Sequence, residues 1–143
     1  MNTRQQASKA IHVSLWIAQS LLAVLFFATG IIKSLAPIEK IAEVLPWVAN
    51  APEAFVRFIG VSEVLGALGL ILPAALRVRP YLTALAAAGL AIVMVLAAAF
   101  HLLQGEVSHI IAPVVIFLMA GFIFWGRTKK APIQSIAYTQ RGA

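Results

Sequence analysis

Four ionisable side chains in or beside apolar segments could carry proton transfer or ligand binding. Glu63 interrupts a nearly apolar stretch at 58–76, and His101 lies near the end of another. Ionisable groups within a membrane are rare and mostly face protein or water, so each is a candidate functional residue. We predict one ligand-binding set: Lys33, Arg57, Glu63 and His101. Glu63 and His101 form a candidate proton relay within it, and the catalytic residues stay unknown.

The expected depth and direction of these side chains bring Glu63 toward His101. Helical side chains lean toward their own N-terminus, and these two residues lie on antiparallel helices. Lys33 or Arg57 would then compensate the charge. Arg57 is about 120° around its helix from Glu63, so we expect it to meet another helix, a lipid phosphate or the amphipathic segment described below. The alternative is a buried pair that only fixes helix register, with Lys33 and Arg57 snorkelling.

Other site chemistries find little support in the sequence. The chain has no cysteine, which excludes disulfides, thiolate nucleophiles and cysteine-ligated metals. His101 and His109 lack a convincing third ligand, so we predict no metal site. No Ser/His/Asp order, glycine-rich phosphate loop or nucleic-acid-binding module is recognisable, and we expect no nucleic-acid partner.

The elements that must position these residues follow from the distribution of charge. The chain has 143 residues, of which 62% are hydrophobic and 11% charged, a composition that argues against a soluble domain. No charged residue occurs at 10–32, 80–105 or 107–126, and each window is long enough to cross a bilayer at about 20 residues. A fourth window, 64–76, is too short because Glu63 precedes it.

The interrupted segment is nevertheless predicted to be a span. Ten Leu, Ile, Val and Phe residues at 58–76 contribute roughly −4 kcal/mol to insertion, against about +2.5 to +3.5 kcal/mol for one central acidic residue. Insertion is therefore favoured with Glu63 inside. Pro73 lies near the far end, where a freed carbonyl can reach the interface.

We therefore predict an all-α integral membrane protein, an antiparallel four-transmembrane-helix bundle with a short amphipathic helix in its first outer loop. The single membrane domain, 1–143, has spans at about 12–32, 56–75, 81–103 and 107–126. The interfacial helix lies at about 37–46, where Ile38, Ile41, Ala42 and Leu45 share one face. Mobile basic ends are expected at 1–11 and 127–143.

The net charge of +6 is explained by orientation. With four spans and a cytoplasmic N-terminus, eight Lys and Arg residues fall inside and three outside, which obeys the positive-inside rule. Three spans with the N-terminus outside would also obey this rule, so segment hydrophobicity decides for four. We expect both termini to be cytoplasmic.

A combined pattern occurs in two segments, RFIGVSEVLGALGLILP at 57–73 and RPYLTALAAAGLAIVMVLAAAFHL at 79–102. In the first segment, an Arg and a Glu lie six residues apart, glycines follow the Glu, and a proline ends the helix. The second segment has a proline, a Leu-Thr pair, an alanine-rich helix and a terminal Phe-His pair. This pattern resembles the DoxX-like family of small four-helix membrane proteins, over about 14–127. The resemblance implies four polar family positions: Lys33, Arg57, Glu63 and His101.

The resemblance implies a fold more securely than a reaction. The family's founding type is associated with thiosulfate:quinone oxidoreduction, relatives are linked to redox-stress complexes at the bacterial membrane, and some animal members act as receptor-assembly chaperones. It therefore implies a multi-pass protein of the bacterial inner membrane. A redox role would make the chain a subunit of a quinone-linked oxidoreductase rather than an enzyme by itself, because it has no flavin, haem or thiol motif.

Three functions stay open on the sequence. The first is a redox-associated subunit that binds a quinone or lipid in an outer-leaflet Glu/His/Lys/Arg pocket, with a quinone as the one cofactor considered. The second is a non-enzymatic membrane scaffold or assembly chaperone. The third, ranked last, is a small transporter. The expected partners are membrane lipids, together with a membrane-protein partner or further copies of the chain.

Overall fold

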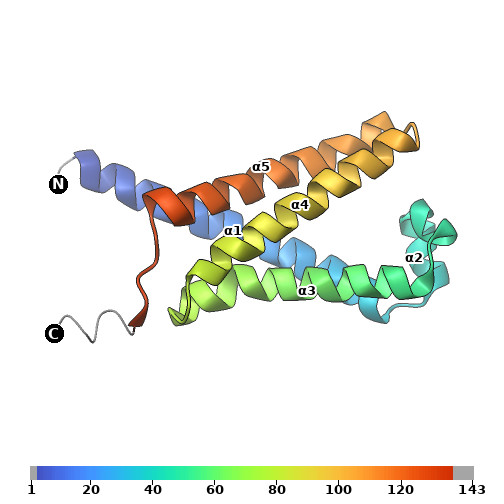
Figure 1. Ribbon diagram of the computed structural model, residues 1–143, viewed down its shortest axis with the longest axis horizontal. Helices are drawn as coiled ribbons and strands as arrows, with labels where there is room; N and C mark the ends of the chain where they lie inside the picture. The colour runs from blue at the N-terminus through green and yellow to red at the C-terminus, as the bar shows by residue number, and fades with distance from the viewer. Residues whose placement is uncertain (1–2, 137–143) are drawn as a thin grey trace.

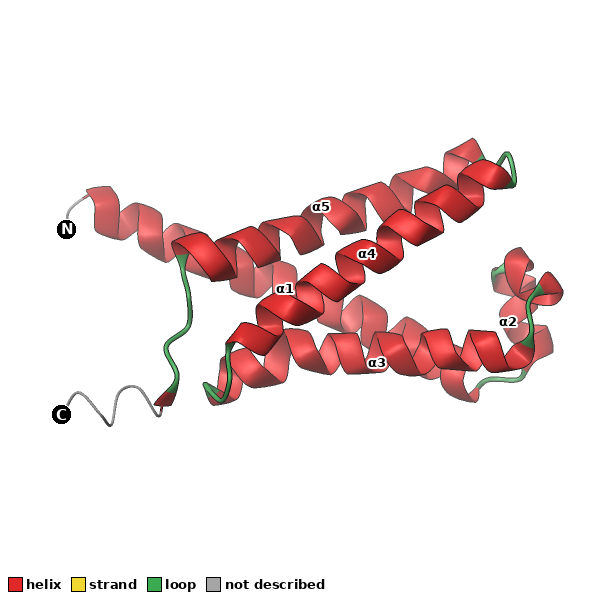
Figure 2. Ribbon diagram, viewed as in Figure 1, coloured by secondary structure: helices red, strands yellow, loops and turns green. Residues whose placement is uncertain are grey.

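Four long helices run back and forth along the molecule and confirm the predicted all-α fold (Figure 1). The computed structural model describes the backbone of residues 3–136 and the side chains of residues 8–136. The long helices are α1 Thr3–Leu35, α3 Glu53–Leu76, α4 Tyr81–Leu103 and α5 Ile111–Trp125. Within the described residues there is no strand, and loops connect the helices (Figure 2).

Short helical elements complete the chain. The amphipathic helix α2, Ile38–Val44, precedes the 3₁₀ helix η1, Pro46–Asn50; a second 3₁₀ helix, η2, Val107–Ile110, leads into α5. The π-helical turn η3, Gly126–Lys130, follows α5 directly. We call the end of the molecule that holds α2, η1 and η2 the α2 end, and the opposite end, where α1 begins and α5 finishes, the basic end.

All four long helices qualify as membrane spans by length and composition. The candidate spans are Ser8–Leu35, Glu53–Leu76, Tyr81–Leu103 and Val107–Lys130. Large apolar side chains are exposed along all of them, which is the surface that lipid would cover. The second of these spans includes Glu63, so the short charge-free window is part of a full-length helix.

Helices α1 and α3 form a closely packed pair because two glycines face each other. A Cβ atom added at Gly30 would lie 2.7 Å from the carbonyl oxygen of Gly60, and one added at Gly60 would lie 2.8 Å from that of Gly30. Contacts this short exclude any side chain at either position, so the two backbones touch. Small residues allow this approach between membrane helices generally. Glu63 lies one turn beyond Gly60 and is thereby held against α1.

The remaining helices pack through a core of small and apolar residues. Helices α4 and α5 form a second pair, which lies across the first and diverges from it toward the α2 end (Figure 1). Ala67, Ala87 and Met94 are buried between helices, and small residues such as these alanines let membrane helices approach closely. The largest fully buried apolar side chains include Leu15, Leu22, Leu70 and Ile123.

The α2 end has a small core of its own. Ile41 of α2, Val48 of η1 and Val56 of α3 are buried together. The Trp47 ring of η1 packs edge-on against Phe100 of α4, with ring centroids 6.4 Å apart. The amphipathic segment is therefore a folded cap that contacts both helix pairs.

At the two ends of the chain, residues 3–11 are the first part of α1, and the predicted basic tail begins with the turn η3, in which Arg127 is buried. The mobility of these ends stays a prediction. Residues 1–2 and 137–143 lie outside the described residues.

The contact between Gly30 and Gly60 generates a matched test. We expect Gly30→Ala and Gly60→Ala to lower stability by about 1 to 3 kcal/mol, the usual cost of overpacking a tight contact. Gly89→Ala and Gly121→Ala should be neutral or slightly stabilising, because nothing lies within 4 Å of a Cβ atom at either position. Unfolding in detergent, followed by circular dichroism, measures all four variants. Equal effects in both pairs would contradict the close approach of α1 and α3.

Candidate functional site

Glu63 is bound entirely by α1. The Lys33 Nζ atom lies 2.5 Å from Oε1 of Glu63, and the Thr29 hydroxyl donates to Oε2 at 3.1 Å. The two charged side chains are 12% and 7% exposed, respectively. Residues 29 and 33 lie one turn apart on the same face of α1, so the glycine contact places both opposite Glu63. Each carboxylate oxygen accepts a hydrogen bond, and the ion pair links α1 to α3.

Arg57 binds the end of α1 rather than Glu63. Its Nη1 atom donates to the backbone carbonyls of Lys33 at 2.9 Å and Ala36 at 2.7 Å, while Nη2 lies 3.0 Å from a Glu53 carboxylate oxygen. The last carbonyls of a helix have no partner within the helix, so a guanidinium group there satisfies them and the negative end of the helix dipole. This confirms the expectation that Arg57 meets another helix.

The predicted meeting of Glu63 and His101 is wrong. Among the described residues, no hydrogen bond or ion pair joins them; the His101 Nδ1 atom lies 2.8 Å from a carboxylate oxygen of Glu106 instead. Glu106 follows His101 closely in sequence, across the turn at Gly105, and Lys33 already satisfies Glu63. The four predicted residues thus divide between two separate clusters at the α2 end. A proton relay through either cluster stays a prediction.

A second polar cluster lies at the basic end, around Arg127. The Arg127 side chain is buried, and its Nε atom donates to Oε1 of Gln19 at 2.5 Å. Gln19 in turn donates from Nε2 to the carbonyl of Leu70 at 2.6 Å, in the turn of α3 that precedes Pro73. Gln19 of α1 therefore connects the turn η3 to α3.

The remaining groups around Arg127 leave its charge without an acidic partner. Its Nη1 atom lies 3.3 Å from Nδ1 of His12 and donates to the Ala131 carbonyl at 3.3 Å; the guanidinium carbon lies 5.2 Å from the Trp16 ring centre. Nη2 is buried and has no hydrogen-bond partner. Of the described residues, none forms a salt bridge with Arg127.

The local chain explains why Arg127 turns inward. Gly126 packs against the side chain of Leu15, and a Cβ atom at that position would collide with it. The π turn that begins there is closed by the Ala131 amide, which donates to the Gly126 carbonyl at 2.8 Å. A π turn changes which side chains face the core, and such turns occur often at functional sites. Arg127 consequently faces α1 rather than solvent.

A cleft of about 670 Å³ lies beside Arg127. The beginning of α4 and the end of α5 form two of its walls, and the segment at 131–136 forms the third. That segment runs from α5 to the turn between α3 and α4, where the Ile136 amide donates to the Arg77 carbonyl at 3.2 Å (Figure 1). The walls combine apolar and polar side chains: Pro80, Tyr81, Ala84, Leu85, Phe124, Arg127, Thr128, Pro132, Ile133 and Ser135.

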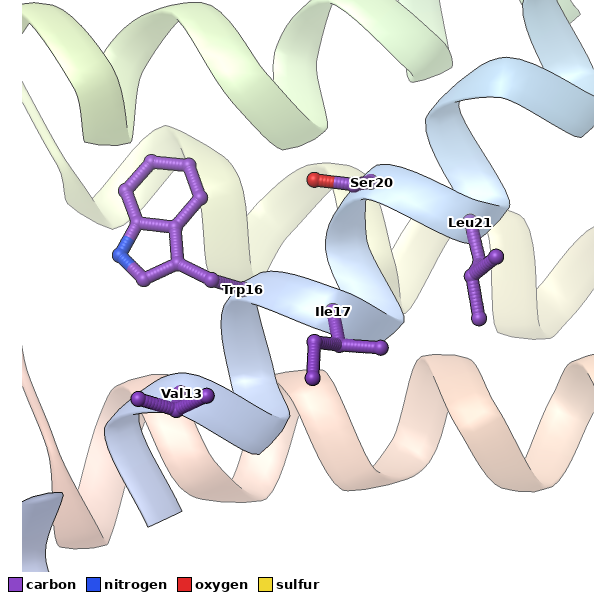
Figure 3. A pocket seen from close by; sticks show the side chains of 5 residues that line it. All are labelled: Val13, Trp16, Ile17, Ser20 and Leu21. Atoms are coloured by element: carbon purple, nitrogen blue, oxygen red, sulfur yellow. The ribbon is translucent and has the colours of Figure 1, made fainter. Parts of the chain in front are cut away.

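A shallower hollow of about 370 Å³ lies on α1 near the same end. Figure 3 shows the side chains of one stretch of α1 that line it: Val13, Trp16, Ile17, Ser20 and Leu21. Trp16 also carries the ring that faces Arg127, and its Nε1 atom donates to His12 at 3.1 Å. The hollow is lined almost entirely by apolar atoms and suits a hydrocarbon chain.

Sequence reasoning missed the cluster at the basic end. Arg127 begins a basic run, so the sequence suggests that it only helps to orient the protein in the membrane. Its inward direction depends on the π turn. Two signals were present in the sequence: Arg127 follows a charge-free window directly, and Gln19 is a polar residue inside another such window. Glu106 was also missed as a partner of His101.

The comparisons with known proteins give a family. The model of the DoxX-like family matches residues 17–123, more than half of the chain. The match includes Lys33, Arg57, Glu63 and His101 and stops short of Arg127. No curated protein and no solved structure matches the chain.

The buried ion pair gives a direct prediction. We expect Lys33→Met or Glu63→Leu alone to lower stability by about 3 to 5 kcal/mol, because each leaves one buried charge unpaired. The double variant should be markedly more stable than either single variant. A double-mutant cycle on unfolding in detergent measures the coupling. Additive effects of the two substitutions would show that the pair does not link α1 and α3.

Proposed function

This chain belongs to the DoxX-like family, and we propose that it is a lipid-binding membrane protein whose basic end takes the head of an anionic lipid. The observation that carries the proposal is the buried Arg127 beside the 670 Å³ cleft, with no acidic partner and a free Nη2 atom.

The charge of Arg127 supports an anionic ligand over a neutral one. A buried charge is costly unless it is paired. Glu63, which is buried in another part of the bundle, has Lys33 as its partner. Among the described residues, none of the hydrogen-bond partners of Arg127 is a carboxylate. A phosphate oxygen in the cleft would supply the missing negative charge, and guanidinium groups bind phosphate strongly.

The cleft suits an amphipathic molecule at a membrane surface. Tyr81, Leu85 and Phe124 offer an apolar wall for the part of the lipid next to its head, and α4 begins at the same place, so its positive dipole end adds to the attraction. The basic end also carries Arg77, Arg79, Lys129 and Lys130. We place this end, with both termini, at the cytoplasmic face of a bacterial inner membrane, where such charges attract anionic lipids.

The quinone-linked redox role is a weaker candidate. Its predicted pocket required Glu63 and His101 to converge, and each has another partner. A neutral quinone would also leave the charge of Arg127 uncompensated. The redox association therefore rests on the family resemblance, with electrons supplied by a partner protein.

A membrane scaffold or assembly role is the second candidate, and the cap at the α2 end favours it. The cap has its own buried core and presents exposed Val44 at 78% relative accessibility. A folded cap of this kind would offer another membrane protein a surface to contact.

Lipids that copurify with the protein test the proposal. We expect native mass spectrometry of the wild type in mild detergent to show about one anionic phospholipid per chain. Arg127→Gln should reduce that occupancy by about tenfold or more, because it removes the charge and the donor fork. Lys129→Gln is the matched control, since it removes one charge from an exposed residue at the same end, and its occupancy should match the wild type.

A second measurement covers the case in which Arg127→Gln folds poorly. Phosphatidylglycerol should raise the unfolding temperature of the wild type and of Lys129→Gln more than phosphatidylcholine does, and Arg127→Lys should lose most of this difference. Equal lipid retention or stabilisation in the Arg127 variants would contradict the proposal. So would a copurifying quinone that is lost from Glu63→Gln or His101→Ala, which would place the site at the α2 end.

A further inference from the structure

Three potential metal ligands converge at the α2 end, where α4 turns into α5. His101 ends α4, Glu106 follows the turn, and His109 lies in η2. Each offers one ligand atom, and all three atoms lie within 4.8 Å of one another. The Nδ1 atoms of His101 and His109 lie 2.8 Å and 3.9 Å from the same Glu106 oxygen.

The backbone holds these groups together before any ion binds. Gly105 has a φ of 74° and closes α4 with two hydrogen bonds, from its own amide to the Leu102 carbonyl at 3.1 Å and from the Glu106 amide to the His101 carbonyl at 2.9 Å. This is a Schellman motif, and it fixes Glu106 beside His101. The His109 amide donates to the Glu106 carbonyl at 3.0 Å, which fixes the third ligand relative to the second.

The two imidazole rings lie next to each other beside Glu106. The rings of His101 and His109 are stacked, with centroids 5.5 Å apart and an angle of 23° between their planes, so both lie on the same side of the turn. Tetrahedral zinc with bonds of about 2.0 to 2.1 Å needs ligand atoms roughly 3.4 Å apart. The two distances to Glu106 lie on either side of that value, and all three ligand atoms lie within 4.8 Å of one another, so rotations of the stacked imidazole side chains would bring them around one ion.

We propose that His101, Glu106 and His109 form a binding site for Zn²⁺ or a related transition-metal cation. Two imidazoles and one carboxylate favour such ions over Mg²⁺ and Ca²⁺, which prefer oxygen ligands. Three protein ligands leave a fourth position for water or an external group. The site is open to solvent, because the Glu106 and His109 side chains are 42% and 66% exposed.

The proposed site differs from the expectation of no metal site, which rested on the lack of a third ligand for His101 and His109. Glu106 supplies a third ligand through the turn at Gly105. The spacing His-x₄-Glu-x₂-His is local, so the ligands do not depend on how the two helix pairs are placed. A bound ion would join the end of α4 to the beginning of α5.

Zinc titration of the full-length chain without a histidine tag tests the site. We expect calorimetry to show one Zn²⁺ per chain, and Co²⁺ bound in its place to show the visible absorption of a low-symmetry site. His109→Ala and Glu106→Gln should each weaken Zn²⁺ binding by more than about tenfold. Substitution of groups that only support a metal ligand already weakens binding by about tenfold or more, and these two residues are ligands themselves. His12→Ala is the matched control and should bind as the wild type does, because His12 lies at the basic end.

A variant that keeps all three ligands separates ion binding from the loss of a side chain. Gly105→Ala strains the left-handed turn while leaving open space around the new methyl group, so it should weaken Zn²⁺ binding without changing the number of ligands. His109 is mostly exposed, so His109→Ala should retain the wild-type unfolding temperature in the absence of metal. The proposal is overturned if the wild type binds no Zn²⁺, or if His109→Ala and His12→Ala bind it equally.

Discussion

Buried polar groups need partners inside the protein, and this requirement sets the arrangement of these helices. Residues of α1 supply most of the partners. Lys33 and Thr29 bind Glu63 of α3, while Gln19 accepts from Arg127 beyond α5 and donates to the backbone of α3. In a bilayer no water is available to replace these partners. The links fix the rotation of α1 against two other helices, and the glycine contact fixes its distance from one of them.

Glu63 and Arg127, the most deeply buried charged side chains among the described residues, have different kinds of partner. Glu63 has a cation and a hydroxyl group, so its carboxylate is satisfied by the chain itself. Arg127 has an amide, an imidazole, a carbonyl and an aromatic face as partners, and none of them is a carboxylate. The first arrangement stabilises a helix pair. The second leaves a positive site that an anion can complete, at the end of the molecule with the most basic residues.

Sequence patterns predict the helices well because insertion depends on summed hydrophobicity, which the sequence states directly. The expected span at 81–103 agrees with α4, Tyr81–Leu103, and the interfacial helix at 37–46 contains α2. Side-chain pairing is harder, because it depends on rotation about each helix. Depth and side-chain direction suggested that Glu63 meets His101, yet Thr29 and Lys33 lie on the face of α1 that the glycine contact turns toward Glu63. The inward direction of Arg127 could not be predicted for a related reason, because a π turn changes the helical period and therefore the direction of each side chain.

Local sequence separation explains which polar contacts at the α2 end form. His101 and Glu106 are five residues apart across a glycine turn, so bringing them together closes a short loop at small entropic cost. A contact between His101 and Glu63 would instead require the two helix pairs to converge where they diverge (Figure 1). The cap bridges that divergence by packing Trp47 on Phe100, which neighbours His101 in the chain. The α2 end thus combines a buried Lys33–Glu63 ion pair between α1 and α3 with a solvent-accessible cluster of His101, Glu106 and His109 between α4 and α5. Substitutions in the cluster can therefore be made without disturbing the ion pair that holds α1 to α3.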